Sequence, residues 1–368
     1  MESQHTKKAA SIKRMEPLRQ EKLGQSTFND SLQPKHPCSV FINASVLLRG
    51  KVFTVYEWGL MGGIIRTRGF EKKGLAKFGV NCGLKCGNLC TYCFTGVTLR
   101  THKAFKELGL NPFRNDYAII DPDTVARVAR DAAHISKRGV VQLCTFVDAW
   151  GPVAQEYSMG RGCLKAILSQ SDWIIRILTK NREVVNDFDL IEKHADRVMV
   201  GLSMTATPDK AEIMSIVEPN ASSNLERRDA MEEAHRRGFR TYAMLCPLLP
   251  GIADAPFQIE ELIRFAVKCG AEEIFVEPVN LRGPGLELTK TALANQGYMD
   301  EAAAIEGIRT NKGWSRYALQ LISNVQHTIR KLYDIRRLRI LLYPSRLTEK
   351  DVARIREDDA GVVWLGND

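Results

Sequence analysis

The chain has 368 residues, 44% of them hydrophobic, and a formal net charge of +9 from 52 basic and 43 acidic side chains. This composition allows a sizeable core and excludes a wholly disordered chain. No run of 18 apolar residues occurs, and the start of the chain lacks the apolar stretch of a signal peptide, so we expect neither a membrane span nor secretion. We therefore expect a cytoplasmic protein whose nine cysteines are thiols or metal ligands rather than disulfides.

The excess positive charge lies at the two ends of the chain. Residues 1–37 read as a flexible basic leader, 38–308 as the core domain and 309–368 as a basic C-terminal extension. Solvation alone explains the leader's basic residues, which include Lys7, Lys8, Lys13 and Arg14. A second cluster brackets an apolar run and is a candidate nucleic-acid contact; it consists of Arg336, Arg337, Arg339 and Arg346.

Six alternations of an apolar run with an amphipathic stretch occupy residues 75 to 335. The expected strands are 75–81, 140–146, 173–178, 197–204, 240–249 and 273–279, with a last extended piece at 339–343. The expected helices are 123–138, 157–169, 184–194, 222–237, 258–268 and 315–332. Such alternation predicts an α/β fold with parallel strands joined by right-handed crossovers. An open doubly wound sheet and a barrel both fit, and both place their sites at the carboxyl ends of the strands.

The loop that follows the first of these strands, residues 82–94, concentrates four of the nine cysteines. Cys86, Cys90 and Cys93 are spaced Cys-x3-Cys-x2-Cys, with Tyr92 before the last. Thiolates held this close suit a metal ion or an iron–sulfur cluster. Structural zinc usually takes two separated pairs of ligands, which are absent here, so zinc is the weaker alternative. Three cysteines would leave one iron of a four-iron cluster without a protein ligand, as in a reactive metal centre.

This segment resembles the signature of the radical S-adenosylmethionine (SAM) superfamily. The resemblance implies a [4Fe–4S] cluster on Cys86, Cys90 and Cys93, SAM chelated to the open iron, and reductive cleavage of SAM to a 5′-deoxyadenosyl radical that abstracts hydrogen from a substrate. It also implies a partial (β/α)6 barrel, which agrees with the six alternations, and a reducing partner of the flavodoxin or ferredoxin class. We treat Cys82, outside the trio, as a bystander.

Further segments resemble the spore photoproduct lyase-like, or DNA repair photolyase, branch of that superfamily. They are residues 141–145 (VQLCT), 178–181 (LTKN), 201–207 (GLSMTAT), 218–222 (EPNAS), 227–238 and 243–254 (AMLCPLLPGIAD). The resemblance implies cofactor-binding roles for Tyr92, Thr145, Lys180 and Ser203, with Lys180 holding the SAM carboxylate. A solvated lysine and a turn-capping serine remain the alternatives.

The same resemblance gives Cys144 a catalytic role, the return of a hydrogen atom to the product; the alternative is a buried small hydrophobe. We expect Cys163, Cys246 and Cys269 to belong to the core, and Arg227 to be structural. Phe94 departs from the branch, which carries a tyrosine directly after the third cluster cysteine, and this argues against an unaltered photoproduct-repair reaction.

Three functions follow in order of preference. The first is a radical SAM lyase-like enzyme that repairs or modifies nucleic acid, favoured by the resemblance and the basic ends. The second is radical modification of a peptide or small metabolite. The third, of a different class, is a non-catalytic metal-cluster protein that binds nucleic acid.

Overall fold

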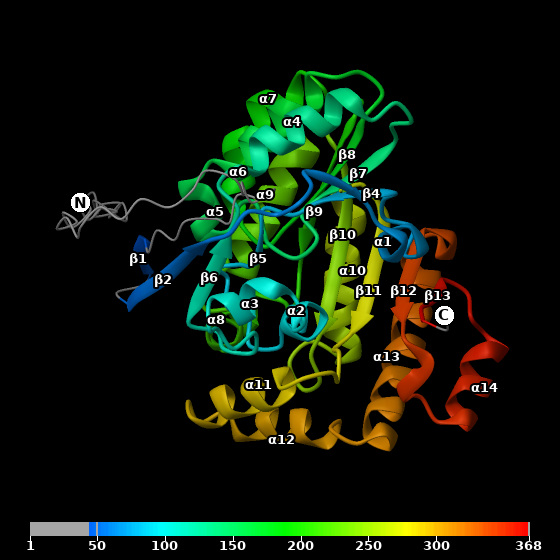
Figure 1. The fold of residues 1–368 in the computed structure, drawn as a ribbon. Coiled ribbons are helices and arrows are strands. Elements are labelled where there is room, and N and C mark those ends of the chain that lie inside the picture. The colour runs from blue at the N-terminus through cyan, green and yellow to red at the C-terminus, as the bar shows by residue number, and fades with distance from the viewer. Residues whose placement is uncertain (1–43, 49–50, 367–368) are drawn as a thin grey trace, which may run out of the picture.

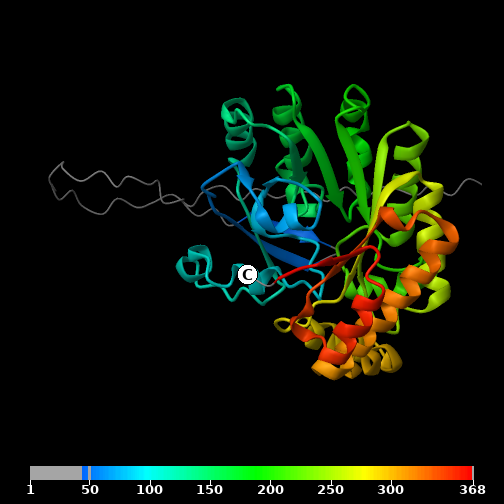
Figure 2. The same ribbon diagram turned by 90° about the vertical axis from the view of Figure 1, so that its right-hand side faces the viewer.

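A nine-stranded, almost wholly parallel sheet organises the part of the chain that the computed structural model describes, residues 44–48 and 51–366. Its strands are β3 (Ile64–Arg66), β4 (Phe78–Val80), β7 (Val140–Leu143), β8 (Ile174–Thr179), β9 (Val198–Ser203), β10 (Arg240–Leu248), β11 (Ala271–Pro278), β12 (Leu338–Leu342) and β13 (Val362–Trp364). Their order is β13-β12-β11-β10-β9-β8-β7-β4-β3. Within this sheet the β3–β4 pair is antiparallel and the other neighbouring pairs are parallel. Figure 2 shows the strands curving into an open arc, and the predicted partial barrel is confirmed.

The six predicted strands of the core each match one parallel strand, from β4 to β11. The last extended piece, expected at 339–343, is β12, and a further short strand, β13, pairs with it. The segment after residue 308 therefore extends the same sheet. The leader, with Lys7, Lys8, Lys13 and Arg14, lies outside the described residues.

Helices cover the outer face of the arc (Figure 1). The long ones that follow the strands are α4 (Thr124–His134), α6 (Met159–Leu168), α9 (Asn224–Arg236), α10 (Pro256–Lys268) and α13 (Asn311–Leu332). Other helices are α1 (Arg68–Lys72), α5 (Pro152–Glu156), α7 (Phe188–Glu192), α8 (Ala211–Val217), α11 (Gly285–Ala294), α12 (Met299–Gly307) and α14 (Glu349–Glu357). Alternate strand residues such as Val141, Ile175 and Val200 are fully buried against this layer. Among the described residues, none of the helices combines the length and apolar character that a membrane span needs.

A second, smaller sheet, which the sequence patterns did not predict, lies beside the cysteine loop. It has the order β1-β2-β6-β5 and consists of β1 (Ala44–Leu48), β2 (Lys51–Glu57), β5 (Gly83–Lys85) and β6 (Tyr117–Ile120). Two short helices, α2 (Thr95–Leu99) and α3 (Lys103–Glu107), follow the loop. Because β5 ends directly before Cys86, this sheet fixes where the cysteine loop begins.

Side chains from several strands close the inside of the arc and form a floor. The Tyr242 hydroxyl donates to the carbonyl of Ile177 at 2.7 Å, and its ring lies 5.0 Å from the Arg176 guanidinium carbon. Arg176 in turn pairs with Glu273. Gly201 makes room for this ring, because a Cβ there would lie 2.2 Å from Cζ of Tyr242.

The C-terminal arginine cluster divides between the two ends of the sheet. Arg336, Arg337 and Arg339 lie at the amino ends of the strands, where Arg336 pairs with Asp334 and Arg339 with Glu273. Arg337 donates to the carbonyl of Glu272 at 3.1 Å. Arg346 follows β12 and lies at the carboxyl ends instead.

We predict that Gly201→Ala lowers the free energy of unfolding by about 1–3 kcal/mol, because the added methyl group must displace a fully buried tyrosine ring. The matched control is Gly139→Ala, where an added Cβ meets nothing within 4 Å. Urea denaturation of both variants measures the difference. Equal stability of the two would show that the floor is not packed as described.

Candidate functional site

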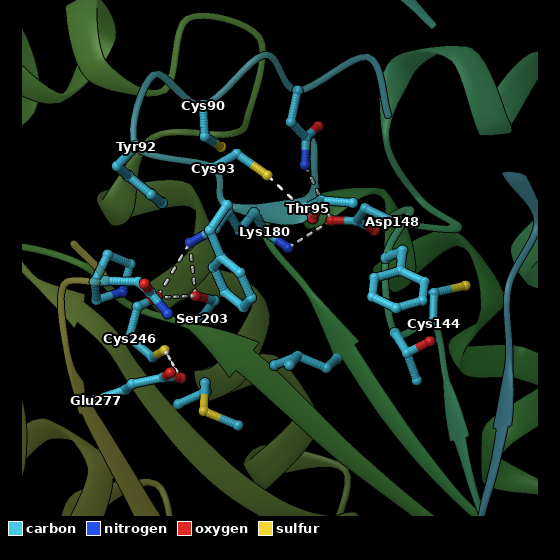
Figure 3. Close-up of a pocket in the computed structure, with 18 of the residues that line it drawn as sticks. Cys90, Tyr92, Cys93, Thr95, Cys144, Asp148, Lys180, Ser203, Cys246 and Glu277 are labelled. Atoms are coloured by element: carbon cyan, nitrogen blue, oxygen red, sulfur yellow. Dashed lines mark hydrogen bonds between the residues drawn. The ribbon is translucent and has the colours of Figure 1, made fainter. Parts of the chain in front are cut away.

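A cavity of about 250 Å³ opens at the carboxyl ends of the parallel strands. Its walls come from the cysteine loop and from the ends of β7 to β11, as Figure 3 shows. The residues predicted for the site that line it are Cys86, Cys90, Tyr92, Cys93, Cys144, Thr145, Lys180 and Ser203. Residues about 120 positions apart in the sequence therefore meet in one space, because parallel strands bring their carboxyl ends to the same edge.

Contacts to two other segments hold the cysteine loop in place. The amide of Thr91 donates to the carbonyl of Val217 at 2.9 Å, and the Asn220 side chain donates to the carbonyl of Gly87 at 3.0 Å. Asn88 is buried and accepts a hydrogen bond of 3.1 Å from the side chain of Asn181. These contacts fix the loop through backbone and amide groups, and within the loop region the Cys93 thiol donates to Thr95 Oγ1 at 3.2 Å.

The three cysteines of the loop line this cavity together. Among the described residues, no three His, Cys, Asp or Glu side chains form a group close enough to hold one metal ion. Burial raises the pKa of Cys86 to about 11 and that of Cys90 well above its usual range. Ligation would therefore release protons from these thiols.

Lys180 is not a solvated lysine at a strand end. Its Nζ donates to Ser203 Oγ at 2.7 Å and lies 3.0 Å from Glu218 Oε1. It also lies 5.7 Å from the centroid of the Tyr92 ring. Three of the predicted cofactor-binding side chains, Tyr92, Lys180 and Ser203, thus form one connected group beside the cysteine loop (Figure 3).

Glu218 connects this group, although no role was predicted for it from its sequence segment. Its carboxylate is buried, pairs with Arg227 and Lys180, and accepts hydrogen bonds from Tyr92 and from Thr205 Oγ1, the latter at 3.1 Å. Burial by itself raises the pKa of Glu218, but Arg227, Lys180 and Tyr92 together lower it to about 2. Arg227 is buried and pairs with this carboxylate, which agrees with its expected structural role.

Asp148 positions the end of β8 on the other side of Lys180. It accepts hydrogen bonds of 2.8 Å from Thr179 Oγ1, from the Lys180 amide and from the Asn181 side chain. It also accepts one of 3.3 Å from Asn88. Because the same carboxylate holds the Lys180 backbone and the cysteine loop, it fixes their relative position.

Thr145 and Cys144 line the cavity, but their polar contacts described below are with Asn81 and Cys82 rather than with Lys180 or Ser203. The Thr145 hydroxyl donates to the side chain of Asn81. The Cys144 sulfur lies 3.9 Å from that of Cys82, and both residues are buried. In Figure 3 the Cys144 thiol points away from Lys180 and Ser203. Cys82, expected to be a bystander, is therefore the direct neighbour of Cys144.

Two of the three cysteines expected in the core are there, and one is not. Cys163 and Cys269 are buried, whereas Cys246 is partly exposed and lines the cavity. The expectation for Cys246 was wrong because it treated the whole apolar strand run as core, whereas Cys246 lies two positions after Met244 and shares its face toward the cavity. The pairing of β10 with β11 is irregular between Leu245 and Leu248, and such bulges redirect side chains.

We predict that Arg227→Met lowers the free energy of unfolding by about 3–5 kcal/mol, because it leaves the Glu218 carboxylate buried with one counter-charge fewer. The control is Arg236→Met on the same helix, whose exposed pair with Glu233 should contribute little to stability. The Glu218 contribution is present above its ordinary pKa of 4.5 and is lost as the pH falls toward 2. Denaturation at neutral and acidic pH measures both effects, and similar losses of stability in the two variants would contradict the buried network.

The chain is similar in sequence to curated proteins and similar in fold to solved structures. No family model matches the chain. An uncharacterized protein of Methanocaldococcus jannaschii is 26% identical over 186 residues, which is 50% of this chain and 66% of that protein. An uncharacterized protein of Mycobacterium tuberculosis is 25% identical over 210 residues, 56% of this chain and 60% of that protein. The chain thus spans less than two thirds of the length of these curated relatives.

Solved structures of spore photoproduct lyase share the fold. The lyase complexed with dinucleoside spore photoproduct aligns with a TM-score of 0.52 and 13% identity, covering 76% of this chain and 79% of the lyase. A variant of the same lyase aligns with a TM-score of 0.51 and 15% identity over the same shares. This chain shares the partial-barrel fold of spore photoproduct lyase.

Proposed function

We propose that the chain is a radical SAM enzyme that binds a [4Fe–4S] cluster through Cys86, Cys90 and Cys93 and abstracts hydrogen from a nucleic-acid substrate. The observation that carries this proposal is the shared cavity, whose lining includes the three cysteines of one loop and the connected group of Tyr92, Lys180 and Ser203. Bound together, the cluster and SAM would supply one-electron cleavage of a sulfonium bond. The electron would come from a reducing partner of the flavodoxin or ferredoxin class.

The chain's own residues supply the binding chemistry around that centre. The Lys180 ammonium is a point charge suited to a carboxylate such as that of SAM, and Ser203 adds a hydroxyl beside it. Glu218 and Asp148 position Lys180 from two sides. Apolar side chains of the cavity, among them Leu178, Met244 and Leu341, limit the access of water to any reactive species formed there.

The mouth of the cavity favours nucleic acid as the substrate class. Arg282 is exposed, and its guanidinium carbon lies 5.7 Å from the Phe94 ring centroid and 5.4 Å from that of Tyr343. Arg282 and Arg346 line one groove, and within the described part of the chain neither pairs with a carboxylate. Basic side chains beside aromatic rings suit a strand of nucleotides, whose phosphates and bases they contact. Consistent with this, the lyase that shares the fold was solved with a dinucleoside photoproduct.

We predict that Cys86→Ala, Cys90→Ala and Cys93→Ala each abolish cluster loading, measured as iron and sulfide per chain after anaerobic reconstitution. Cys82→Ala, the matched control directly before β5, should load normally, because its thiol faces Cys144. Full iron in a Cys90 variant would defeat the ligand assignment.

The loaded protein should cleave SAM to 5′-deoxyadenosine with dithionite under anaerobic conditions, and UV-irradiated thymine-containing DNA is the first substrate to assay. Cleavage without any change in the DNA would support a peptide or small-metabolite substrate. An intact cluster with no cleavage would support a non-catalytic binding protein.

We predict that Arg282→Ala combined with Arg346→Ala weakens the binding of single-stranded DNA, measured by fluorescence anisotropy. The magnitude of the salt slope should fall by about 0.7 for each phosphate that the variant no longer neutralises. Arg336→Ala combined with Arg337→Ala removes the same charge at the other end of the sheet and should leave binding close to that of the unaltered protein. The proposal for the mouth fails if the two double variants weaken binding equally.

A further inference from the structure

Cys246 places a thiol on the wall of the cavity opposite the cysteine loop. Between Leu245 and Leu248, strand β10 advances one residue more than its partner β11. Because of this bulge, both Cys246 and Pro247 line the cavity instead of alternating between its inside and the helical layer. The Cys246 carbonyl accepts hydrogen bonds from Ser203 Oγ at 3.1 Å and Lys180 Nζ at 3.4 Å. The residue that carries this thiol therefore contacts, through its backbone carbonyl, Ser203 and Lys180, which are proposed to bind SAM.

A buried carboxylate holds this thiol. The Cys246 Sγ donates to Glu277 Oε2 at 3.1 Å, as Figure 3 shows, and Glu277 is only 7% exposed. Lys73 Nζ lies 3.8 Å from the same oxygen and near the Phe70 and Tyr343 rings. The ammonium balances the charge of the carboxylate, so the cavity wall presents an intact S–H group beside a neutral ion pair.

The environment favours the thiol over the thiolate. Burial, followed by the charge and the hydrogen bond of Glu277, raises the pKa of Cys246 well above its usual range. A thiol kept protonated is a poor nucleophile. Its S–H bond is, however, weaker than an aliphatic C–H bond, so a carbon radical that reaches it gains by taking its hydrogen atom. Cys144 differs, since its sulfur faces Cys82 and points away from the centre of the cavity.

We propose that Cys246 is the hydrogen-atom donor to carbon-centred radicals formed in this cavity, with Glu277 as its positioning residue. The inference rests on the proposed function. In the step, the S–H bond of Cys246 breaks homolytically and a C–H bond forms on the radical, which leaves a neutral thiyl radical. One electron from the same low-potential donor that serves the cluster, and one proton passed through Glu277 from solvent, restore the thiol.

The test uses SAM alone as the probe, in D₂O, with the reconstituted enzyme and dithionite. The exchanged thiol carries deuterium, so the 5′-deoxyadenosine formed should contain one deuterium per molecule. Cys246→Ala should lose most of that label while iron loading is unchanged. Cys144→Ala and the core control Cys269→Ala should keep it. Label that survives in the Cys246 variant and disappears in the Cys144 variant would overturn the proposal.

A second measurement needs neither cluster nor turnover. Removing the Glu277 charge should lower the pKa of Cys246, so Glu277→Gln should speed its alkylation by iodoacetamide near neutral pH, followed peptide by peptide by mass spectrometry. Glu272→Gln, on the same strand but paired with Arg240 at the other end, is the control. Rapid alkylation of Cys246 in the unaltered protein, unchanged in the Glu277 variant, would refute the thiol–carboxylate pair. Failure to form any 5′-deoxyadenosine would instead count against the proposed function, and the alkylation result would then decide the placement of Cys246.

Discussion

The buried carboxylate of Glu218 is the interaction on which the arrangement of the site depends. It binds Tyr92 from the cysteine loop, Lys180 from the end of β8 and Arg227 from α9. A carboxylate buried without partners would be strongly unfavourable, so the three elements must meet for the charge to be tolerated. Asp148 is a second carboxylate of this kind on the other side of Lys180, and it accepts hydrogen bonds from the Thr179 hydroxyl and the Lys180 amide. The cavity thus has one wall fixed by charge compensation, and that wall carries Cys86, Cys90 and Cys93.

The opposite wall is built differently. It comes from the bulged end of β10 and the end of β11, and its polar groups are Cys246, Glu277 and Lys73. Under the proposed function, the first wall would bind the cosubstrate and the second would deliver the hydrogen atom, and these two tasks need different chemistry. The mouth adds exposed arginine and aromatic rings, which suits a substrate that is charged along its backbone and planar in its bases.

Much of the fold could be predicted because its signals are local. Each of the six core strands is a short apolar run, and a parallel sheet buried on both faces requires such runs. In the small sheet, β5 escaped prediction because it has three residues and overlaps the cysteine motif. The cysteine trio was recognisable from spacing alone. Glu218 was not, since its partner Tyr92 lies 126 positions away in the sequence. Cys246 was misplaced because an apolar strand run does not show which of its alternating faces lines a cavity rather than the core. The arginine cluster did carry a usable signal: Arg336 and Arg337 precede a strand, whereas Arg346 follows it.

The most direct test of the central claim concerns the iron atom that no side chain should bind. Mössbauer spectroscopy of the protein reconstituted with ⁵⁷Fe, with and without SAM, reports on each iron of the cluster. Three cysteine ligands predict that the signal of one iron in four shifts when SAM is added, and that the other three do not move. Four iron sites that stay unchanged by SAM, each saturated by protein ligands, would contradict the account.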